Sequence, residues 1–218
     1  MAKAIIILSG GMDSVTLLHD LAARGVECYG LTFDYGQRHR KELAYAHYCG
    51  KKLCAMHKTV SLGAIKSIIS SSVLTGKGDI PKQHYTHANQ KLTVVPNRNM
   101  VMLSIAVAWA ENLKIKEVYF GPHANDNAIY PDCRPRFVEV LSMAAQLGTY
   151  SQVKIYAPYV HIRKSDIAAR GHLLGVDYSR TWSCYEGKKL HCGKCGTCQE
   201  RKEAFINSHV PDPTIYRQ

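Results

Sequence analysis

Hydrophobic patterns of strand type and of helix type alternate along most of this chain. Residues 4–8 read AIIIL, an uninterrupted apolar run that is too short for a helix, and they predict a strand buried on both faces. After two glycines the period changes, because Val15, Leu18 and Leu21 share one face of a helix that Gly25 ends. A fully apolar strand followed by an amphipathic helix is typical of a parallel sheet that helices cover.

The same alternation continues to residue 175. We expect further strands at 26–32, 57–61, 116–120 and 153–157, and further helices at 38–54, 100–113, 137–148 and 164–174. The helix over 100–113 is apolar nearly all round, and we therefore expect it to be buried on all sides. There is no detectable internal repeat. The pattern predicts a Rossmann-like, doubly wound α/β domain over 1–178 with a parallel five-stranded sheet.

Residues 70–91 differ in character from their surroundings. They contain a run of serines followed by scattered glycines and polar residues, without a helical or strand period. A stretch of this length inside a compact domain is usually a functional lid or an insertion. We predict a mobile lid near 70–91 and assign it no chemistry.

The turn after the first strand reads SGGMDS. Gly10 and Gly11 can adopt positive φ angles and let backbone N–H groups approach an anion. These groups lie at a helix N-terminus, where free donors and the helix dipole favour negative charge. Ser9 and Ser14 add hydroxyl donors, whereas the Asp13 carboxylate either caps the turn or helps to hold Mg²⁺ on a pyrophosphate group. An ordinary strand–turn–helix with a cap is the alternative.

This turn resembles the SGGxDS phosphate loop of the ATP pyrophosphatases, which adenylate an oxygen atom and release pyrophosphate. Neither the Walker pattern nor the dinucleotide-binding pattern is present. The resemblance implies that ATP is bound by the residues from the end of the first strand to the first turn of the helix, together with an aromatic residue at the end of the second strand: Leu8, Ser9, Gly10, Gly11, Met12, Asp13, Ser14, Val15 and Phe33.

The charge balance of the chain is basic. It has 218 residues, with 28 Lys and Arg against 17 Asp and Glu, which gives a net charge of +11. The cationic residues are dispersed, so we favour a small anionic substrate over nucleic acid. No apolar run is long enough to span a membrane, and the N-terminus enters a strand without a signal peptide. We expect a cytoplasmic protein.

Part of the cysteine content is concentrated near the C-terminus, at Cys184, Cys192, Cys195 and Cys198. Four thiolates at these spacings suit a closed tetrahedral zinc ion, whose role is structural because no coordination position stays open. The alternatives are an iron–sulfur cluster, a redox-active Cys-x-x-Cys pair, or a site in which His191 replaces one cysteine. We expect a zinc-binding extension over 179–218 that attaches a helix near 200–208 to the main domain.

Polar residues also follow the later strands of the predicted sheet. Arg98 and Asn99 directly precede the apolar helix, where an arginine is best explained by a carboxylate or phosphate partner. After the strand over 116–120, polar side chains are dense from His123 to Arg134. Polar density at the exit of a parallel strand is what a substrate pocket needs.

With these stretches located, the chain resembles the 7-cyano-7-deazaguanine synthases, the QueC-type enzymes of queuosine and archaeosine precursor synthesis. The resemblance runs from residue 5 to about 213 and rests on the clustered cysteines and on the motifs SGGMDS at 9–14, FDYGQRH at 33–39, VPNRN at 95–99, YPDCRP at 130–135 and TWSCY at 181–185. It implies that ATP adenylates 7-carboxy-7-deazaguanine, that ammonia converts the anhydride to an amide, and that a second ATP drives dehydration to the nitrile. It also implies Mg²⁺ with ATP and a homodimer.

The same resemblance implies roles for individual residues. The catalytic residues would be Asp13, Ser14, Arg98 and Lys164. The deazaguanine pocket would be lined by Arg98, Asn99, Asp126, Tyr130, Asp132 and Arg134. Because ammonia is the attacking nucleophile, we expect positioning and charge stabilisation to dominate catalysis.

Two stretches depart from the family pattern. Residues 121–130 read GPHANDNAIY where the family has GVNxxDYSGY, so His123 and several neighbours differ while Asp126 and Tyr130 are kept. This change leaves open whether the product is the nitrile or the amide. Asn97 replaces a glycine, which is a milder change because asparagine tolerates positive φ.

Two other functions stay open at this point. One is a relative that uses the same loop on another acceptor, such as a tRNA thiolase or an amidating synthetase. A thiolase would need a catalytic cysteine pair near ATP, and Cys133 has no evident partner. The other is a zinc-stabilised nucleic-acid-binding protein, which salt-sensitive RNA binding without ATP turnover would reveal.

Overall fold

Parallel strands form the centre of the structure, a computed structural model that describes residues 1–65, 68, 71–76, 78–82 and 91–217. The 5-stranded sheet has the order β3-β2-β1-β4-β5, and every neighbouring pair is parallel. The strands are β1 Lys3–Ile7, β2 Glu27–Asp34, β3 Met56–Ser61, β4 Glu117–Tyr119 and β5 Lys154–Tyr156. The predicted Rossmann-like parallel sheet is confirmed, and its strand order reverses between β1 and β4, where such sheets bind ligands.

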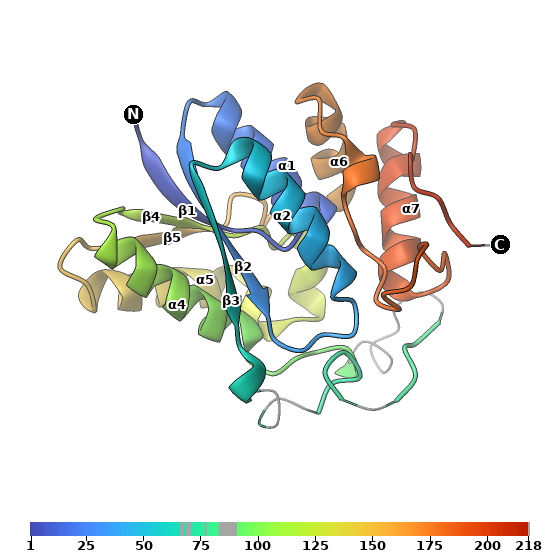
Figure 1. The fold of residues 1–218 in the computed structure, drawn as a ribbon, viewed down its shortest axis with the longest axis horizontal. Helices are drawn as coiled ribbons and strands as arrows, with labels where there is room; N and C mark the ends of the chain where they lie inside the picture. The colour runs from blue at the N-terminus through green and yellow to red at the C-terminus, as the bar shows by residue number, and fades with distance from the viewer. Residues whose placement is uncertain (66–67, 69–70, 77, 83–90, 218) are drawn as a thin grey trace.

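Helices cover both faces of the sheet (Figure 1). One face carries α1 Met12–Ala23, α2 Lys41–Leu53, α6 Lys164–Leu173 and α7 Gly196–Ser208, and the other carries α4 Arg98–Asn112 and α5 Pro135–Leu147. Ile6 belongs to the core under the first face and Ile5 to the core under the second, as expected for successive residues of a buried strand. In the described part of the chain, no helix combines the length and the apolar character that crossing a membrane requires.

The C-terminal helix α7 is built into the core of the main domain. Ala204 and Phe205 belong to the same apolar cluster as residues of α1 and α6. The fully buried Arg201 guanidinium donates hydrogen bonds to the Thr181 hydroxyl at 2.9 Å and to the Tyr178 carbonyl oxygen at 2.8 Å. The helix expected near 200–208 is therefore present, begins four residues earlier at Gly196, and is attached by apolar packing and by a buried cation.

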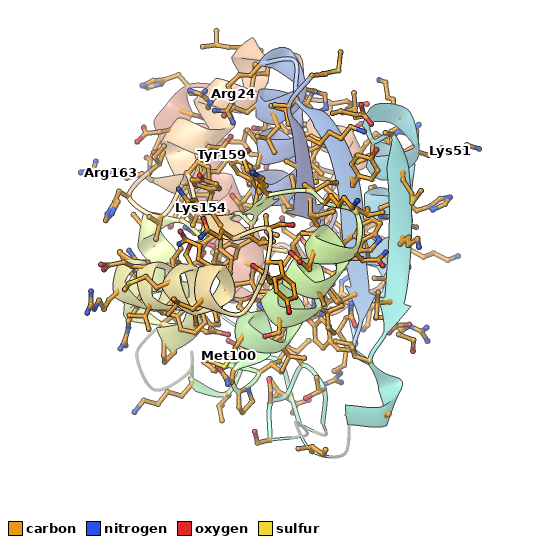
Figure 2. All side chains as sticks on the ribbon, turned by 90° about the vertical axis from the view of Figure 1, so that its left-hand side faces the viewer. Arg24, Lys51, Met100, Lys154, Tyr159 and Arg163 are labelled. Atoms are coloured by element: carbon orange, nitrogen blue, oxygen red, sulfur yellow. The ribbon has the colours of Figure 1, made fainter. Side chains whose placement is uncertain are left out.

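The expectation that the helix over 100–113 is buried on all sides is wrong. Helix α4 forms there, but only Met102, Leu103, Ala106 and Ala110 are buried. Every fourth residue along its outer side is exposed, at positions 100, 104, 108 and 112. Small residues such as alanine and serine occur both inside proteins and at their surface, so the composition of this helix did not show which of its sides is exposed. Figure 2 shows α4 beside α5 at the surface, with the side chain of Met100 directed outward.

Most of the lid predicted near 70–91 lies outside the described residues, and its mobility stays a prediction. In the described part, Val73 and Leu74 are buried in the core that α4 and α5 cover. The backbone N–H of Arg38 donates to the Leu74 carbonyl oxygen at 3.0 Å. This short piece therefore packs on the domain next to the loop that follows β2.

The packing of α7 leads to a stability prediction. Phe205→Ala removes a fully buried ring from the shared core and should lower the free energy of unfolding by about 3–5 kcal/mol. Urea unfolding should still show a single transition, because α7 shares its core with α1 and α6. Ile206→Ala is the control, since Ile206 is 69% exposed and should change stability by about 0.5 kcal/mol or less. A separate early transition for α7 would contradict this interpretation.

Candidate active site

The turn between β1 and α1 has no room for a side chain at Gly10. Its φ is +83°, and a Cβ atom there would lie 2.3 Å from the carbonyl oxygen of Glu42 and 2.7 Å from the backbone nitrogen of Ala46. Both contacts come from the first half of α2. Gly11 has an ordinary extended φ of −77° and is the N-cap of α1, so only the first of the two glycines uses the left-handed region.

Serine hydroxyls stabilise this turn from inside. The Ser14 hydroxyl donates to the Gly11 carbonyl oxygen at 3.2 Å and accepts from the Ser9 backbone N–H at 3.2 Å. Helix α1 has no side-chain cap, so Asp13 does not cap the turn and needs another explanation. Backbone N–H groups at the start of a helix favour an anion, so this turn is a candidate anion site.

Asp13 belongs to a group of buried charges, here called the Lys164 cluster: Asp13, His123, Asp126, Lys164 and Glu200. The Lys164 Nζ atom lies 3.4 Å from Asp13 Oδ2, 2.8 Å from Glu200 Oε2 and 3.2 Å from His123 Nε2. His123 Nε2 is also 3.4 Å from Asp126 Oδ2. Burial alone would lower the pKa of Lys164, but the carboxylates of Asp13 and Glu200 raise it above its ordinary value, so the ammonium stays charged. Burial raises the pKa of Asp126.

A cavity of about 230 Å³ connects the turn, the Lys164 cluster and the start of α4. Many residues predicted to form the site line it: Leu8, Ser9, Gly11, Asp13, Ser14, Phe33, Arg98, Asn99, Asp126, Tyr130 and Lys164. They come from the carboxyl ends of β1 and β2, from the segment that follows β4 and from the first residues of α1, α4 and α6. The fold thus brings together segments that are far apart in the sequence, at the edge of the sheet where ligands bind.

Other predicted site residues do not line the cavity: Gly10, Met12, Val15, Asp132 and Arg134. Met12 and Val15 point into the core. Asp132 Oδ2 accepts the backbone N–H of Asn99 at 2.8 Å, so it holds the N-terminus of α4 without lining the cavity itself. Arg134 Nε donates to the Asn127 carbonyl oxygen at 3.1 Å. These residues would therefore act on a ligand only through the backbone and core that they hold in place.

Arg98 is presented to the cavity without an acidic partner. It is the first residue of α4, directly after Asn97, whose φ of 52° confirms that asparagine adopts the left-handed conformation here. Its guanidinium donates to the Tyr35 hydroxyl at 3.0 Å. Within the described chain it forms no ion pair with a carboxylate. A partly buried guanidinium in this state favours an anionic ligand.

The cavity also has lining residues to which the sequence analysis gave no role, namely His39, Glu42, His123, Tyr185 and Glu200. His39 and Tyr185 lie inside the motifs FDYGQRH and TWSCY, so the motifs were a usable signal. His123 was noted as the start of the polar stretch that follows the strand over 116–120 and as a departure from the family pattern, but it was given no role of its own. Glu42 and Glu200 lie inside helices with no local signal, and only the folded chain shows them in the cavity.

Glu42 is a buried carboxyl group fixed by Gln37. The Gln37 side-chain amide donates to Glu42 Oε1 at 2.9 Å and to the Phe33 carbonyl oxygen at 3.2 Å, and its own oxygen accepts the Tyr35 backbone N–H at 2.9 Å. Burial raises the pKa of Glu42 to about 7. Burial also lowers the pKa of the neighbouring His39 to about 3, so this imidazole is neutral and forms no strong ion pair with Glu42.

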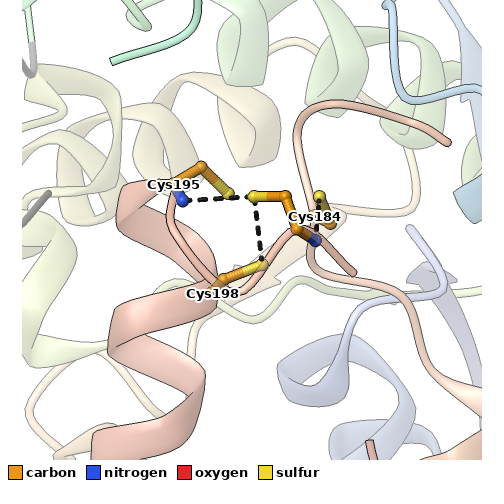
Figure 3. A group of neighbouring side chains, drawn as sticks. Cys184, Cys195 and Cys198 are labelled. Atoms are coloured by element: carbon orange, nitrogen blue, oxygen red, sulfur yellow. Dashed lines mark hydrogen bonds between the residues drawn. The ribbon is translucent and has the colours of Figure 1, made fainter. Parts of the chain in front are cut away.

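The four clustered cysteines form a second centre beside the cavity. All are buried, and their sulfur atoms lie within 4.8 Å of one another (Figure 3). The backbone N–H groups of Lys194 and Cys195 donate to the Cys192 sulfur at 3.4 and 3.2 Å, which is suited to a thiolate. His191 is not a member of the group, because its Nε2 accepts the Ser183 backbone N–H at 3.2 Å. The arrangement could hold a metal ion.

Residues 179–218, here called the cysteine extension, also contact the turn between β1 and α1. The backbone N–H of Trp182 donates to the Gly10 carbonyl oxygen at 2.9 Å. The Lys41 ammonium lies 4.2 Å from the centroid of the Trp182 ring. One wall of the cavity is thus supplied by the extension, through Trp182, Ser183, Tyr185, Thr197 and Glu200.

The fold and the cavity define a Rossmann-like α/β protein whose candidate site lies at the carboxyl edge of its parallel sheet. Solved structures with this arrangement include an NMN synthetase from Francisella tularensis, with a TM-score of 0.50 and 16% identity over 96% of this chain and 78% of that one. A 4-thiouridine synthetase in complex with RNA and bound ATP has a TM-score of 0.51 and 16% identity, over 82% of this chain and 42% of that one. At these identities the likeness concerns the fold.

Sequence comparison gives the family. Residues 3–209 match the family described as queuosine biosynthesis protein QueC, and the chain belongs to this family of enzymes. A 7-cyano-7-deazaguanine synthase from Hahella chejuensis is 49% identical over 214 residues, which are 98% of this chain and 93% of the relative. One from Methanoregula boonei is 48% identical over 98% of this chain and 99% of the relative. The resemblance inferred from the motifs is confirmed.

The buried Glu42 leads to a prediction about pH and stability. Its folded pKa of about 7 lies above its unfolded value, so its contribution is present at pH 4 and is lost as the pH rises through 7. The loss should be up to about 3 kcal/mol between pH 4.5 and pH 8. Glu42→Gln removes this titration, and urea unfolding of both proteins across this range measures it. Parallel stability profiles for the two proteins would contradict the prediction.

Proposed function

We propose that this chain is an ATP-dependent carbon–nitrogen ligase that converts 7-carboxy-7-deazaguanine and ammonia to 7-cyano-7-deazaguanine. The names of its relatives support the product. The single observation that supports the chemistry is that one cavity holds both a candidate anion-binding turn with a buried lysine and an arginine that forms no ion pair with a carboxylate among the described residues. One region suits nucleotide phosphates and the other suits an acidic substrate.

The proposed reaction activates the same substrate carbon twice, first as an acid and then as an amide. A carboxylate oxygen attacks the α-phosphorus of ATP and pyrophosphate leaves, which gives the acyl adenylate. Ammonia attacks the carbonyl carbon, AMP leaves with the substrate's oxygen, and a proton is lost to give the amide. The amide oxygen then attacks a second ATP, again releasing pyrophosphate. Loss of AMP and of protons from nitrogen leaves the nitrile.

The phosphate end of the cavity is formed by the turn after β1 and by Lys164. Backbone N–H groups at the start of α1, with Ser9 and Ser14, bind the phosphates, while the Lys164 ammonium stabilises charge on the transferring and leaving groups. Phe33 lies at the end of β2, where the adenine would bind. Asp13 Oδ1 is buried and has no hydrogen-bond partner among the residues that the structure describes, which fits a carboxylate that awaits a cation. Asp13 would hold the Mg²⁺ that accompanies ATP, and this ion neutralises phosphate charge.

The acceptor end is formed by Arg98, Asn99, Asp126 and Tyr130, which line the same cavity. Arg98 binds the substrate carboxylate or a phosphate, and a carboxylate such as Asp126 pairs with the guanine-like N1–H and amino group. Asp132 supports this end by holding the backbone N–H of Asn99. No side chain has to act as a nucleophile, because ammonia attacks, so positioning dominates.

Zinc is the ion that best fits the cysteine group. Four buried thiols with mutual sulfur distances within 4.8 Å match a closed tetrahedral site, and no position is left for catalysis. The ion would fix the wall of the cavity that the extension supplies. A homodimer stays a proposal that rests on the family resemblance alone.

A direct assay tests the proposed function. Purified protein with Mg²⁺, ATP, ammonium and 7-carboxy-7-deazaguanine should release AMP and pyrophosphate, and mass spectrometry of the product distinguishes nitrile from amide. This distinction matters because His123 lies in the Lys164 cluster where the family pattern differs. AMP formation that depends on tRNA instead of the deazaguanine acid would contradict the proposal.

Lys164→Met should lower kcat about 10²–10³-fold, because the cation that stabilises phosphate charge is lost. Lys154→Met is the matched control, since Lys154 is exposed on β5 and outside the cavity. The initial rate of pyrophosphate release measures both variants. Equal rates for Lys164→Met and the unchanged protein would exclude a role for Lys164 in the transfer.

Metal removal gives a further test. The purified protein should contain about one zinc per chain by elemental analysis. Cys195→Ser should lose the metal, melt at a lower temperature and lose activity, because it removes one of the four sulfur ligands at the start of α7, where the extension forms a wall of the cavity. Cys54→Ser, a change of a cysteine outside the group, should keep the metal. A metal-free Cys195→Ser variant with unchanged melting and turnover would contradict a structural metal.

A further inference from the structure

Glu200 brings a carboxylate from the cysteine extension into the Lys164 cluster. It lies on α7, two residues after Cys198, and its Oε2 atom is 2.8 Å from the Lys164 Nζ. The side chains are only 9% exposed for Lys164 and 15% for Glu200, so water screens the pair poorly. Among the ion pairs of the described residues, this is the shorter of the two that Lys164 makes.

The second ion pair of Lys164 has a different character. Asp13 Oδ2 lies 3.4 Å from the ammonium, while Asp13 Oδ1 is buried and has no hydrogen-bond partner in the described part of the chain. A buried carboxylate oxygen without a partner is costly, and it fits a ligand that arrives with the nucleotide. Lys164 is flexible enough to move toward Asp13, and a closer ion pair there would compete with a cation for the same carboxylate.

His123 is the third group in contact with the Lys164 ammonium. Its Nε2 lies 3.2 Å from Lys164 Nζ and 3.9 Å from Asp13 Oδ2. The imidazole is almost fully buried, at 2% exposure. It therefore occupies the space between Asp13 and Asp126 and limits how far the ammonium can turn.

We propose that Glu200 is a positioning residue that holds the Lys164 ammonium at the phosphate end of the cavity and keeps the Asp13 carboxylate available to the cation that accompanies ATP. This inference rests on the proposed function. When Asp13 binds the cation, the ammonium keeps Glu200 as its partner, so charge stays balanced in the buried cluster. The extension thereby contributes to the phosphate site through one side chain, in addition to any metal it holds.

Removal of the Glu200 charge should therefore change the requirement for Mg²⁺. In Glu200→Gln the ammonium loses its nearer carboxylate and turns to Asp13, which then binds Mg²⁺ less well. We expect the Mg²⁺ concentration for half-maximal rate at fixed ATP to rise about tenfold, in the range typical of coupling between contacting groups. The affinity for ATP with Mg²⁺, measured by calorimetry without the acceptor substrate, should fall by a similar factor, while ATP affinity in EDTA changes less.

Two controls separate positioning from a structural effect. Glu203→Gln makes the same change one turn further along α7, at a residue outside the cavity lining, and should leave the Mg²⁺ dependence unchanged. In a Lys164→Met background, Glu200→Gln should have no additional effect on Mg²⁺ dependence, because the cation it positions is absent. Zinc content and melting temperature are measured for every variant.

The outcomes are distinct. An unchanged Mg²⁺ dependence in Glu200→Gln, or an equal shift in the Lys164→Met background, overturns the proposal. If Glu200→Gln lowers zinc content or melting temperature, Glu200→Asp replaces it, and a folded aspartate variant must lie closer to the unchanged protein than the glutamine variant does. If the unchanged protein makes no AMP from the deazaguanine acid, the proposed function fails, while the calorimetric comparison still tests the role of Glu200.

Discussion

The whole site depends on how closely the turn after β1 approaches α2. The carbonyl oxygen of Glu42 and the backbone of Ala46 occupy the space that any side chain at residue 10 would need. Because Gly10 has none, the turn can lie against α2 and α1 can begin directly behind it, with its N–H groups directed to the cavity. Its carbonyl oxygen also accepts the Trp182 backbone N–H, so the same residue anchors the cysteine extension.

A second constraint follows from the charges gathered in front of this turn. A buried ammonium is stable only beside carboxylates, and Lys164 has them from α1 and from α7. Arg98 forms no ion pair with a carboxylate in the described chain. The cavity therefore has a cation without an ion-pair partner at the start of α4, whereas the positive charge of Lys164 is balanced by carboxylates. This asymmetry suits a reaction in which an acid, then an amide, is brought to the α-phosphorus of a nucleotide held by the turn.

Much of this arrangement could be predicted from the sequence, because local patterns determine it. The apolar run before Ser9, the glycines and the cysteine spacing predicted the sheet, the turn and the group of four cysteines. The failures involve tertiary structure. The exposed side of α4 consists partly of Ser104 and Ala108, whose types do not report exposure. Asp132 accepts the backbone N–H of Asn99, a tertiary contact that the sequence did not indicate, and its predicted role at the substrate stays a prediction. Glu200 had no signal, because its role exists only once α7 docks on α6.

Transfer of oxygen to the nucleotide tests the central claim most directly. If the acid attacks the α-phosphorus of ATP held by the turn, then 7-carboxy-7-deazaguanine labelled with ¹⁸O at both carboxylate oxygens must pass label to AMP. Each AMP released should carry one ¹⁸O from the substrate, in the amide-forming step and again in nitrile formation, and pyrophosphate should carry none. Label in inorganic phosphate or in water, with unlabelled AMP, would contradict the account.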